Sequence, residues 1–370
     1  MKKTNMKKIL SILLVLVLTM SMVTGCSKKD KNTELSGNDS STADNQNDVV
    51  SKEEDDTEDD TQDLEEEEEA PVDKTDIKVA ALKGPTSMGM VKIMEDSSNG
   101  KAANNYTFTI AGAPDEITAG IVKGDIDIAA IPCNLASVLY NKSKGEIAVA
   151  GINTLNVLYI VETGTTINSI EDLKGKTIYS TGKGTTPEYT LNYLLSSYGI
   201  DPEKDVTIEY KSEATEVAAA LSEATDAIAM LPQPFVTTVM MNNDKVRIAL
   251  NVAEEWDKVS TNGSTVVTGV VVVNKTFLEN NKEAVEAFLT EYETSAQYVN
   301  ENVEEAAALI EKYDIFKAAV AQKAIPDSNI TFIQGDDMQT KITGYLDVLF
   351  AQNPDSVGGT MPDDAFYYKK

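Results

Sequence analysis

The stretches "EITAGIVKGDIDIAAIP" (116–132) and "EVAAALSEATDAIAMLP" (216–232) align at an offset of 100 residues without a gap. Each starts with an acidic residue, continues with helical apolar spacing and ends in an apolar run that closes on a proline. At the same offset, "ALKGPTSMGM" (81–90) aligns with "STGKGTTPEYTL" (180–191), so that a Lys-Gly-x-Thr corner also occurs twice. The chain therefore contains one structural unit in two copies.

Each copy predicts the order strand, helix, strand, helix, strand. In the second copy, Pro187 suits the first position of a helix over 187–198, Thr186 is expected as its N-cap, and Gly199 is expected to end it. Such alternation predicts right-handed βαβ units, with helices on the faces of a parallel sheet. The expected strands are 77–82, 106–112, 125–131, 176–181, 205–211 and 226–231, and the expected helices start at Thr86 or Ser87 or span 115–123, 187–198 and 213–223.

The repeated corners lie at the carboxyl ends of predicted strands, where open α/β sheets bind ligands. Pro132 and Pro232 end two further strands at the same edges. Two such lobes facing one another would enclose a cleft, with one corner on each wall. Helix N-termini at 86–87 and 186–187 would direct backbone N–H groups into that cleft.

The rest of the folded part predicts two crossovers and a helical tail. Apolar, β-branched runs at 152–164 and 264–277 are expected to connect the lobes. Helical spacing follows at 282–299, 302–315 and 337–353, which we assign mainly to the first lobe. We expect lobe 1 to comprise 76–160 and 264–370, and lobe 2 to comprise 161–263.

The amino-terminal part predicts export and attachment to a membrane. Basic residues precede an apolar run at 9–23, and Val23-Thr24-Gly25-Cys26 resembles a bacterial lipobox, so 1–25 is expected to be a signal peptide and Cys26 to carry a lipid. A plain signal peptide with an incidental cysteine is the alternative. Residues 27–75 hold 19 acidic and 5 basic side chains, half of the chain's net charge of −28, so we expect 26–75 to be a disordered tether.

Composition excludes several classes of function. The chain has no histidine, which removes the usual general base and the commonest metal ligand. Its net charge is −28 and Arg247 is its single arginine, which excludes nucleic acid as a partner. Cys133 is the only cysteine besides Cys26, and we expect it to be a small buried residue near the cleft. No catalytic residue, cofactor or metal site is expected.

The motifs resemble those of the substrate-binding lipoproteins of ABC importers that have the type II solute-binding fold. Their nearest counterparts are binding proteins for nitrate, sulfonates, taurine and thiamine precursors. The resemblance covers about 76–350 and rests on "IVKGDIDIAAIPCNLAS" (121–137), "STGKGTTPEY" (180–189) and "LPQPF" (231–235). It implies two lobes, each a mainly parallel sheet flanked by helices, joined by two hinge crossovers. Gln233 stands where relatives often carry an acidic residue, and a neutral amide favours a cationic ligand less than a carboxylate would.

The candidate ligand-binding residues lie on the loops that should line the cleft. The hydroxyl-bearing ones could equally cap helices and turns, and Asn134 could simply cap the helix that begins after it. Gln233 and Phe235 suit a pocket wall, where an amide orients a ligand and an aromatic ring shapes the pocket. The predicted set is Thr86, Ser87, Asn134, Ser180, Thr181, Gly182, Thr185, Thr186, Gln233 and Phe235.

Three further features favour structural roles over chemistry. Met88, Met90 and Met94 should fill core gaps. Asp115-Glu116 should start a helix near the rim of the cleft. Trp256 is expected on the surface of a helix, with a place in the cleft as the alternative.

Together these features predict a lipid-anchored, extracytoplasmic receptor, monomeric, which delivers a small solute to ABC permease subunits. The lack of a basic cluster near the corners suits a neutral or singly anionic solute, such as an alkyl sulfonate. A thiamine or flavin precursor stacked on Phe235 and tyrosines is the alternative ligand. A surface sensory or adhesion module that reuses the fold is the alternative function, and neighbouring permease and ATPase genes would favour the receptor.

Overall fold

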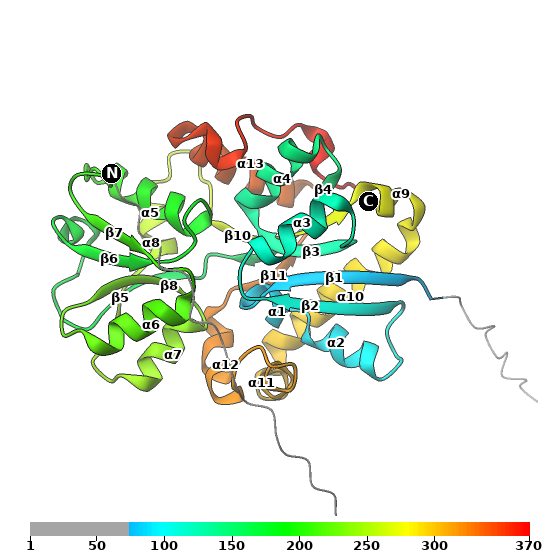
Figure 1. The fold of residues 1–370 in the computed structure, drawn as a ribbon, viewed down its shortest axis with the longest axis horizontal. Coiled ribbons are helices and arrows are strands. Elements are labelled where there is room, and N and C mark those ends of the chain that lie inside the picture. The colour runs from blue at the N-terminus through cyan, green and yellow to red at the C-terminus, as the bar shows by residue number, and fades with distance from the viewer. Residues whose placement is uncertain (1–73) are drawn as a thin grey trace, which may run out of the picture. The chain divides into compact units, whose positions relative to one another are not determined.

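Two sheets organise residues 74–370, the part of the chain that the computed structural model describes (Figure 1). The first has the strand order β11-β4-β10-β3-β1-β2, and we name the part built on it the first lobe. The second has the order β7-β6-β8-β5-β9, and the part built on it is the second lobe. The strands of the first sheet are β1 (Asp76–Leu82), β2 (Asn105–Ala111), β3 (Ile128–Pro132), β4 (Ile147–Leu155), β10 (Val267–Asn274) and β11 (Ile330–Ile333). Those of the second are β5 (Leu158–Glu162), β6 (Thr177–Ser180), β7 (Thr207–Tyr210), β8 (Ile228–Pro232) and β9 (Arg247–Asn251).

The repeat in the sequence corresponds to the same pairing in both sheets. β1 pairs in parallel with β2 and β3, and β6 pairs in parallel with β7 and β8. The remaining strands pair antiparallel, because β4, β5 and β10 adjoin the crossovers and return against the repeat. The predicted α/β fold with two lobes is confirmed, but each sheet is mixed and not mainly parallel.

Helices cover both sheets, and most lie where the sequence predicts them. One helix differs: the segment after the first corner forms a single turn, α1, and then α2 after a break at Gly89-Met90. The helices packed with the first sheet are α1 (Pro85–Met88), α2 (Val91–Ser98), α3 (Asp115–Lys123), α4 (Cys133–Ser143), α9 (Lys275–Asn280), α10 (Lys282–Glu301), α11 (Val303–Lys312), α12 (Ala318–Ala324) and α13 (Gly335–Gln352). Those of the second lobe are α5 (Thr186–Ser197), α6 (Ala214–Glu223), α7 (Phe235–Asn242) and α8 (Val252–Val259). Short 3-10 turns span Ile170–Leu173, Ile325–Asp327, Pro354–Val357 and Asp364–Phe366.

The core follows the alternation of side chains along the strands. Ile77, Val79 and Ala81 pack with α2, α10 and α11, whereas Ala80 belongs to the cluster with α3, α4 and α13. The cluster that contains Ala80 extends into the second lobe, where it includes Leu194 of α5. The opposite face of the second sheet packs separately against α6 and α7. The lobes therefore share a continuous hydrophobic core on the side of α13.

The chain crosses between the sheets at two places. The first crossover runs from Leu155 at the end of β4 to Leu158 at the start of β5. The second runs from Val259 at the end of α8 to Val267 at the start of β10. Leu158–Ile160, which the sequence analysis placed in the first lobe, pair with β8 and β9 and so belong to the second sheet.

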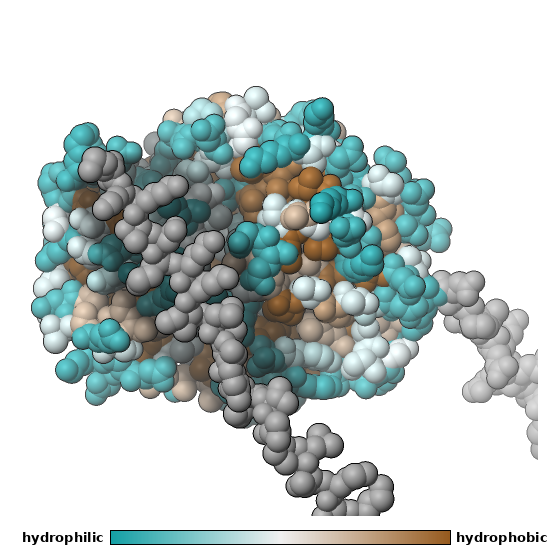
Figure 2. Space-filling model, viewed as in Figure 1, coloured by the Kyte–Doolittle hydropathy of each residue, from teal (hydrophilic) through white to brown (hydrophobic). Residues whose placement is uncertain are grey.

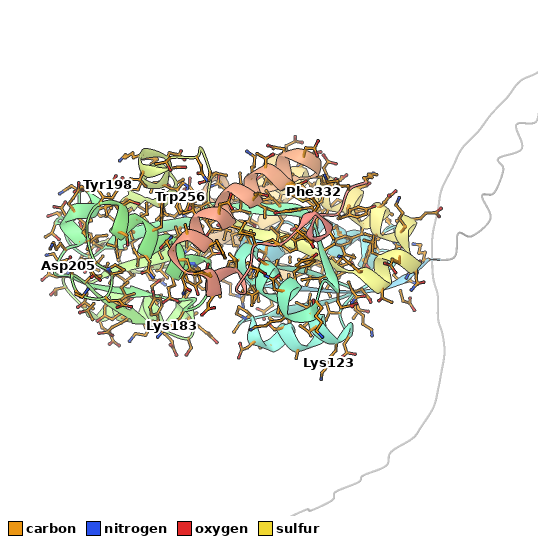
Figure 3. The ribbon with its side chains drawn as sticks, turned by 90° about the horizontal axis from the view of Figure 1, so that it is seen from above. Lys123, Lys183, Tyr198, Asp205, Trp256 and Phe332 are labelled. Atoms are coloured by element: carbon orange, nitrogen blue, oxygen red, sulfur yellow. The ribbon has the colours of Figure 1, made fainter. Side chains whose placement is uncertain are left out.

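The carboxyl-terminal helices contact both lobes. α12 packs against α7, and α13 packs against α5. Trp256 on α8 is fully buried, with its ring 5.6 Å from that of Tyr345 on α13 and 4.4 Å from that of Tyr193 on α5. In Figure 3 it lies where α8 meets α13, away from the side on which Lys123 and Lys183 project. The expected surface position of Trp256 is wrong, because its helix turns this residue into the shared core.

The predicted signal peptide, lipidation site and most of the tether lie outside the described residues. Lys74 and Thr75, assigned to the tether, are bonded to the fold: Lys74 Nζ donates to Ala102 O at 2.7 Å, and Thr75 O accepts from Asn105 N at 2.9 Å.

Figure 2 shows a mostly hydrophilic face on which apolar side chains gather over α3 and α4, where Val122 is 40% exposed. Between residues 74 and 370, no helix combines the length and the hydropathy that crossing a membrane requires.

Candidate functional site

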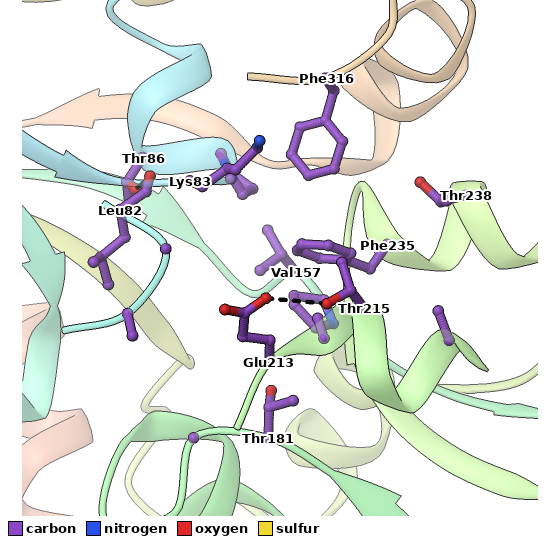
Figure 4. Close-up of a pocket in the computed structure, with 18 of the residues that line it drawn as sticks. Leu82, Lys83, Thr86, Val157, Thr181, Glu213, Thr215, Phe235, Thr238 and Phe316 are labelled. Atoms are coloured by element: carbon purple, nitrogen blue, oxygen red, sulfur yellow. Dashed lines mark hydrogen bonds between the residues drawn. The ribbon is translucent and has the colours of Figure 1, made fainter. Parts of the chain in front are cut away.

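A cleft of about 770 Å³ lies between the two sheets and is lined by both repeated corners (Figure 4). The first lobe contributes the loops after β1, β2 and β3, and the second lobe contributes the corresponding loops after β6, β7 and β8. This is the edge at which the carboxyl ends of the repeat strands meet, as expected for ligand sites of open α/β sheets. Its volume is within the usual range for small-molecule pockets.

The first corner is closed by hydrogen bonds within the first lobe. Gly84 has φ of +145°, a conformation that strongly favours glycine, and α1 follows directly. Ser87 Oγ donates to Gly84 O at 3.0 Å and accepts from Gly84 N at 3.3 Å. Thr86 Oγ1 donates to Leu82 O at 2.8 Å, and its carbonyl accepts from Tyr292 OH at 3.1 Å. Because α1 is a single turn, it supplies little of the helix dipole expected at this corner.

The second corner uses different partners although its sequence pattern is the same. Thr185 is the N-cap of α5 and its hydroxyl donates to Gly182 O at 2.7 Å, so the prediction of Thr186 as N-cap is wrong by one residue. Thr186 lies inside the first turn, and its hydroxyl donates to Asn134 Oδ1 at 3.3 Å. Gly184 N donates to the Glu188 carboxylate, so this N–H group is already occupied.

Asn134 joins the first lobe to the second corner. It lies within α4 and not at its cap, because α4 begins at Cys133 with Pro132 before it. Its side chain is fully buried, and Nδ2 donates to Gly184 O at 3.3 Å and to Ser356 O at 3.1 Å. With the bond from Thr186, this amide connects α4, the second corner and the carboxyl-terminal segment.

Aromatic side chains form one end of the cleft. Phe235 at the start of α7 and Phe316 between α11 and α12 meet edge to face, with ring centroids 5.1 Å apart. Lys83 of the first corner places its ammonium 6.0 Å from the centroid of Phe316. In Figure 4, Lys83 and Phe316 lie above Val157 of the first crossover, and the ring of Phe235 lies beside it.

The charged side chains of the wall carry both signs. Lys317 pairs with Glu311 at 3.1 Å, on the segment that also carries Asp314 and Phe316. Glu213 precedes α6, and its carboxylate accepts a hydrogen bond from Thr215 Oγ1 at 3.1 Å. Among residues 74–370, Lys83, Glu213 and Asp314 lie more than 4.0 Å from any oppositely charged side chain.

The structure brings six of the ten predicted ligand-binding residues to the wall of the cleft: Thr86, Thr181, Gly182, Thr185, Thr186 and Phe235. The other four, Ser87, Asn134, Ser180 and Gln233, are buried behind it and bonded within the protein. Gln233 Oε1, for example, accepts from both N and Oγ1 of Thr237, at 3.2 and 2.9 Å.

Sequence reasoning did not identify Glu213 and Phe316 as candidates, and placed Lys83 only in the corner motif. At the offset of 100, Glu213 aligns with Ala113, so a charge present in only one copy of the repeat was the available signal. Phe316 had no comparable signal, because it comes from the helical tail and reaches the cleft only through the packing of α11 and α12.

Two observations concern chemistry at the site. Burial raises the pKa of the fully buried Cys133 thiol, which keeps it protonated and unreactive. Within the described part of the chain, no group of three or more His, Cys, Asp or Glu side chains is placed to hold a metal ion. The cleft therefore offers apolar and aromatic surface, hydroxyl groups and charged groups of both signs.

Two α/β lobes joined by two crossovers, with a cleft between their corners, define the class of two-lobed solute-binding proteins. The NMT1/THI5 like family model matches residues 121–306, half of the chain. The chain therefore belongs to the NMT1/THI5 like family, and the predicted group is confirmed.

Solved structures share this fold. An ABC transporter protein from Parabacteroides distasonis is 25% identical, with a TM-score of 0.67, over 80% of this chain and all of that one. The alkanesulfonate-binding protein of Xanthomonas axonopodis pv. citri, bound to MOPS, is 14% identical, with a TM-score of 0.61, over 76% of this chain and 94% of that one. The periplasmic aliphatic sulphonate-binding protein of Escherichia coli is 14% identical, with a TM-score of 0.63, over 80% and 92% of the two chains. No curated protein matches the chain.

Proposed function

We propose that this chain is the solute receptor of an ABC importer and that it binds a small organic solute, such as an alkyl sulfonate, in the cleft between its lobes. The observation that carries the proposal is the cleft itself, which is lined by residues of both repeated corners, Thr86 and Thr186 among them. Structural similarity to proteins named as sulfonate-binding supports the choice of solute.

Binding would act through closure of the two lobes. A solute that touches both walls gains its full set of contacts only when they approach, so it stabilises the closed form over the open one. The two crossovers, Leu155 to Leu158 and Val259 to Val267, are the segments that would bend. The permease would recognise the closed form.

We infer that the cleft serves binding and not catalysis. The chain has no histidine, and the one cysteine of the described part, Cys133, is buried behind the wall with a raised pKa. Neither a cofactor nor a metal is needed for the proposed role. We infer a monomer that acts outside the cytoplasm.

Native mass spectrometry of the protein purified from its host tests the proposal. A closed cleft retains its ligand, so we expect a bound species whose excess mass matches a small organic solute and disappears after unfolding and refolding. A Phe235→Ala variant purified in the same way should carry less of it, because Phe235 forms part of the cleft wall. Identical spectra before and after refolding, with no solute that raises the thermal midpoint, would overturn the proposal.

A heterocyclic precursor of thiamine or a flavin is the second candidate ligand. Phe235 and Phe316, with centroids 5.1 Å apart, present aromatic surface on which such a ring would stack. The mass of the retained species distinguishes this candidate from a sulfonate directly.

We further propose that a lipid on Cys26 holds the receptor at the membrane. A Cys26→Ala variant should appear in the medium, whereas the wild type should sediment with membranes and incorporate labelled palmitate. A variant that still sediments, together with a wild type that takes up no label, would contradict the anchor.

A further inference from the structure

Besides Asp314, the wall of the cleft holds two charged side chains that form no ion pair within the described part of the chain. They are Lys83, on the first corner, and Glu213, before α6 of the second lobe. Both are exposed, and neither has an oppositely charged group within 4.0 Å in residues 74–370. By contrast, Glu311 and Lys317 of the same wall neutralise one another.

Glu213 is not needed to cap its helix. It occupies the N-cap position of α6 but makes no side-chain cap bond. Glu216 provides the interaction instead, as its Oε2 accepts from Ser212 N at 3.0 Å. In the first lobe Glu116 does the same for Ala113 N at 2.7 Å, and that helix starts without any counterpart of Glu213. The loop that precedes this helix occurs in both lobes, and its hydrogen bonds require an acid at the position of Glu213 in neither lobe.

The position of Glu213 brings its carboxylate across the cleft to the first lobe. A Cβ placed on Gly112, in the loop after β2, would lie 3.9 Å from Glu213 Oε1. The Glu116 carboxylate reaches the same place, with Oε1 3.3 Å from that Cβ, so a second negative charge strengthens the local potential. Figure 4 shows the Glu213 carboxylate pointing into the cleft, with the side chain of Val157 between it and Lys83 in this view and the ring of Phe235 beside Val157.

We propose that the cleft selects zwitterionic solutes, with Lys83 facing the anionic group and Glu213 receiving an amine. The inference rests on the proposed function and narrows its ligand class. The apolar surface of Val157 and Phe235 accommodates the carbon skeleton of the solute, whereas Lys83 attracts its anionic group and Glu213 attracts its ammonium group. Gln233, buried and bonded to Thr237, supplies no charge to the site.

Closure of the cleft would remove water from both charged groups. This costs solvation free energy, and an oppositely charged ligand group compensates for that cost. In the closed form, a solute that has an anionic group but no amine would place an apolar group against the Glu213 carboxylate. A matched amine would gain a charge-assisted hydrogen bond, typically worth a factor of about ten or more in affinity.

Two pairs of sulfonates test the inference by calorimetric titration of the full receptor. Within each pair an ammonium replaces a methyl group: 4-(aminomethyl)benzenesulfonate against 4-ethylbenzenesulfonate, and 3-aminopropane-1-sulfonate against butane-1-sulfonate. We expect wild type to favour the aminated member of at least one pair by about tenfold. Glu213→Gln should bring this preference close to unity, whereas Lys83→Met should weaken both members and keep the preference.

Two further variants control the assignment. Glu223→Gln removes an exposed acid at the far end of α6, outside the cleft, and should reproduce wild type. Asp314→Asn removes the other acid of the wall without an ion pair; if the preference disappears there and persists in Glu213→Gln, the assignment to Glu213 is wrong. Equal or tighter binding of the alkyl members by wild type would overturn the inference and leave the receptor intact. Failure of all four compounds to bind would overturn the sulfonate proposal as well.

Discussion

The two repeated corners share a sequence pattern but differ in how the protein uses them. At the first, Thr86 bonds to Leu82 O four residues upstream, and the loop closes on itself. At the second, Thr186 bonds to Asn134, a residue of the other lobe. One corner is therefore self-contained, and the other forms part of the contact between lobes. A repeated sequence motif places a corner at the same point of both sheets, whereas its backbone conformation and its side-chain partners differ between the two lobes.

The largest expected effect concerns how the second lobe is held by α13. Trp256→Ala should lower the free energy of unfolding by about 3–5 kcal/mol, because it empties a fully buried site between Tyr193 and Tyr345. Urea titration measures the loss, and Trp256→Phe should lose less because it keeps most of the volume. A loss below ~1 kcal/mol, the size of an ordinary surface effect, would show that the shared core does not bind the lobes together.

The two threonines should differ in their effect on stability. Thr186→Val leaves Asn134 Oδ1 without this donor in a fully buried site, which costs about 1–3 kcal/mol. Thr86→Val releases Leu82 O at the half-buried edge of the cleft, where water can replace the hydroxyl, so we expect a smaller loss. Equal losses in urea titrations of the two variants would contradict the difference between the corners.

The order should reverse for affinity. Thr86 lines the cleft and is 8% exposed, whereas Thr186 is 1% exposed and engaged by Asn134. Once the solute is identified, Thr86→Val should weaken its binding by about 0.5–1.5 kcal/mol, the value of a neutral hydrogen bond, and Thr186→Val should weaken it less. Because both act through one closure, the double variant should not equal the sum of the singles. Unchanged affinity in Thr86→Val would show that this hydroxyl bonds only to Leu82 O and contributes nothing to ligand binding.

The smallest effect is expected from the acidic segment. Deleting 27–73 should change the free energy of unfolding by less than ~1 kcal/mol, because so polar a segment has little to bury. The deletion stops before Lys74, whose ammonium bonds to Gly100 O and Ala102 O. Extending it through Thr75 should cost more, and equal midpoints for the two deletions would show that Lys74 and Thr75 contribute nothing.

The sequence predicted the repeat, most of the helices and the six cleft residues that lie on the loops after repeat strands. These depend on local patterns: apolar spacing, prolines at the first helical turn and glycines at corners. β9 and β11 were not predicted, since four or five residues at a sheet edge carry little pattern. Trp256 and Phe316 could not be placed because the packing of the carboxyl-terminal helices decides their surroundings. Glu213 was visible only as a break in the repeat.

The distance between the lobes tests the central claim most directly. Lys123 and Glu223 occupy corresponding ends of α3 and α6 on the two lobes, and Cys133 is buried, so spin labels on Lys123→Cys and Glu223→Cys in a Cys26→Ala background report their separation. Adding the solute retained by the native protein should shorten and narrow the distance distribution, and Phe235→Ala should require more solute for the same change. A distribution that saturating solute leaves unchanged would contradict binding by closure of the two corners on one ligand.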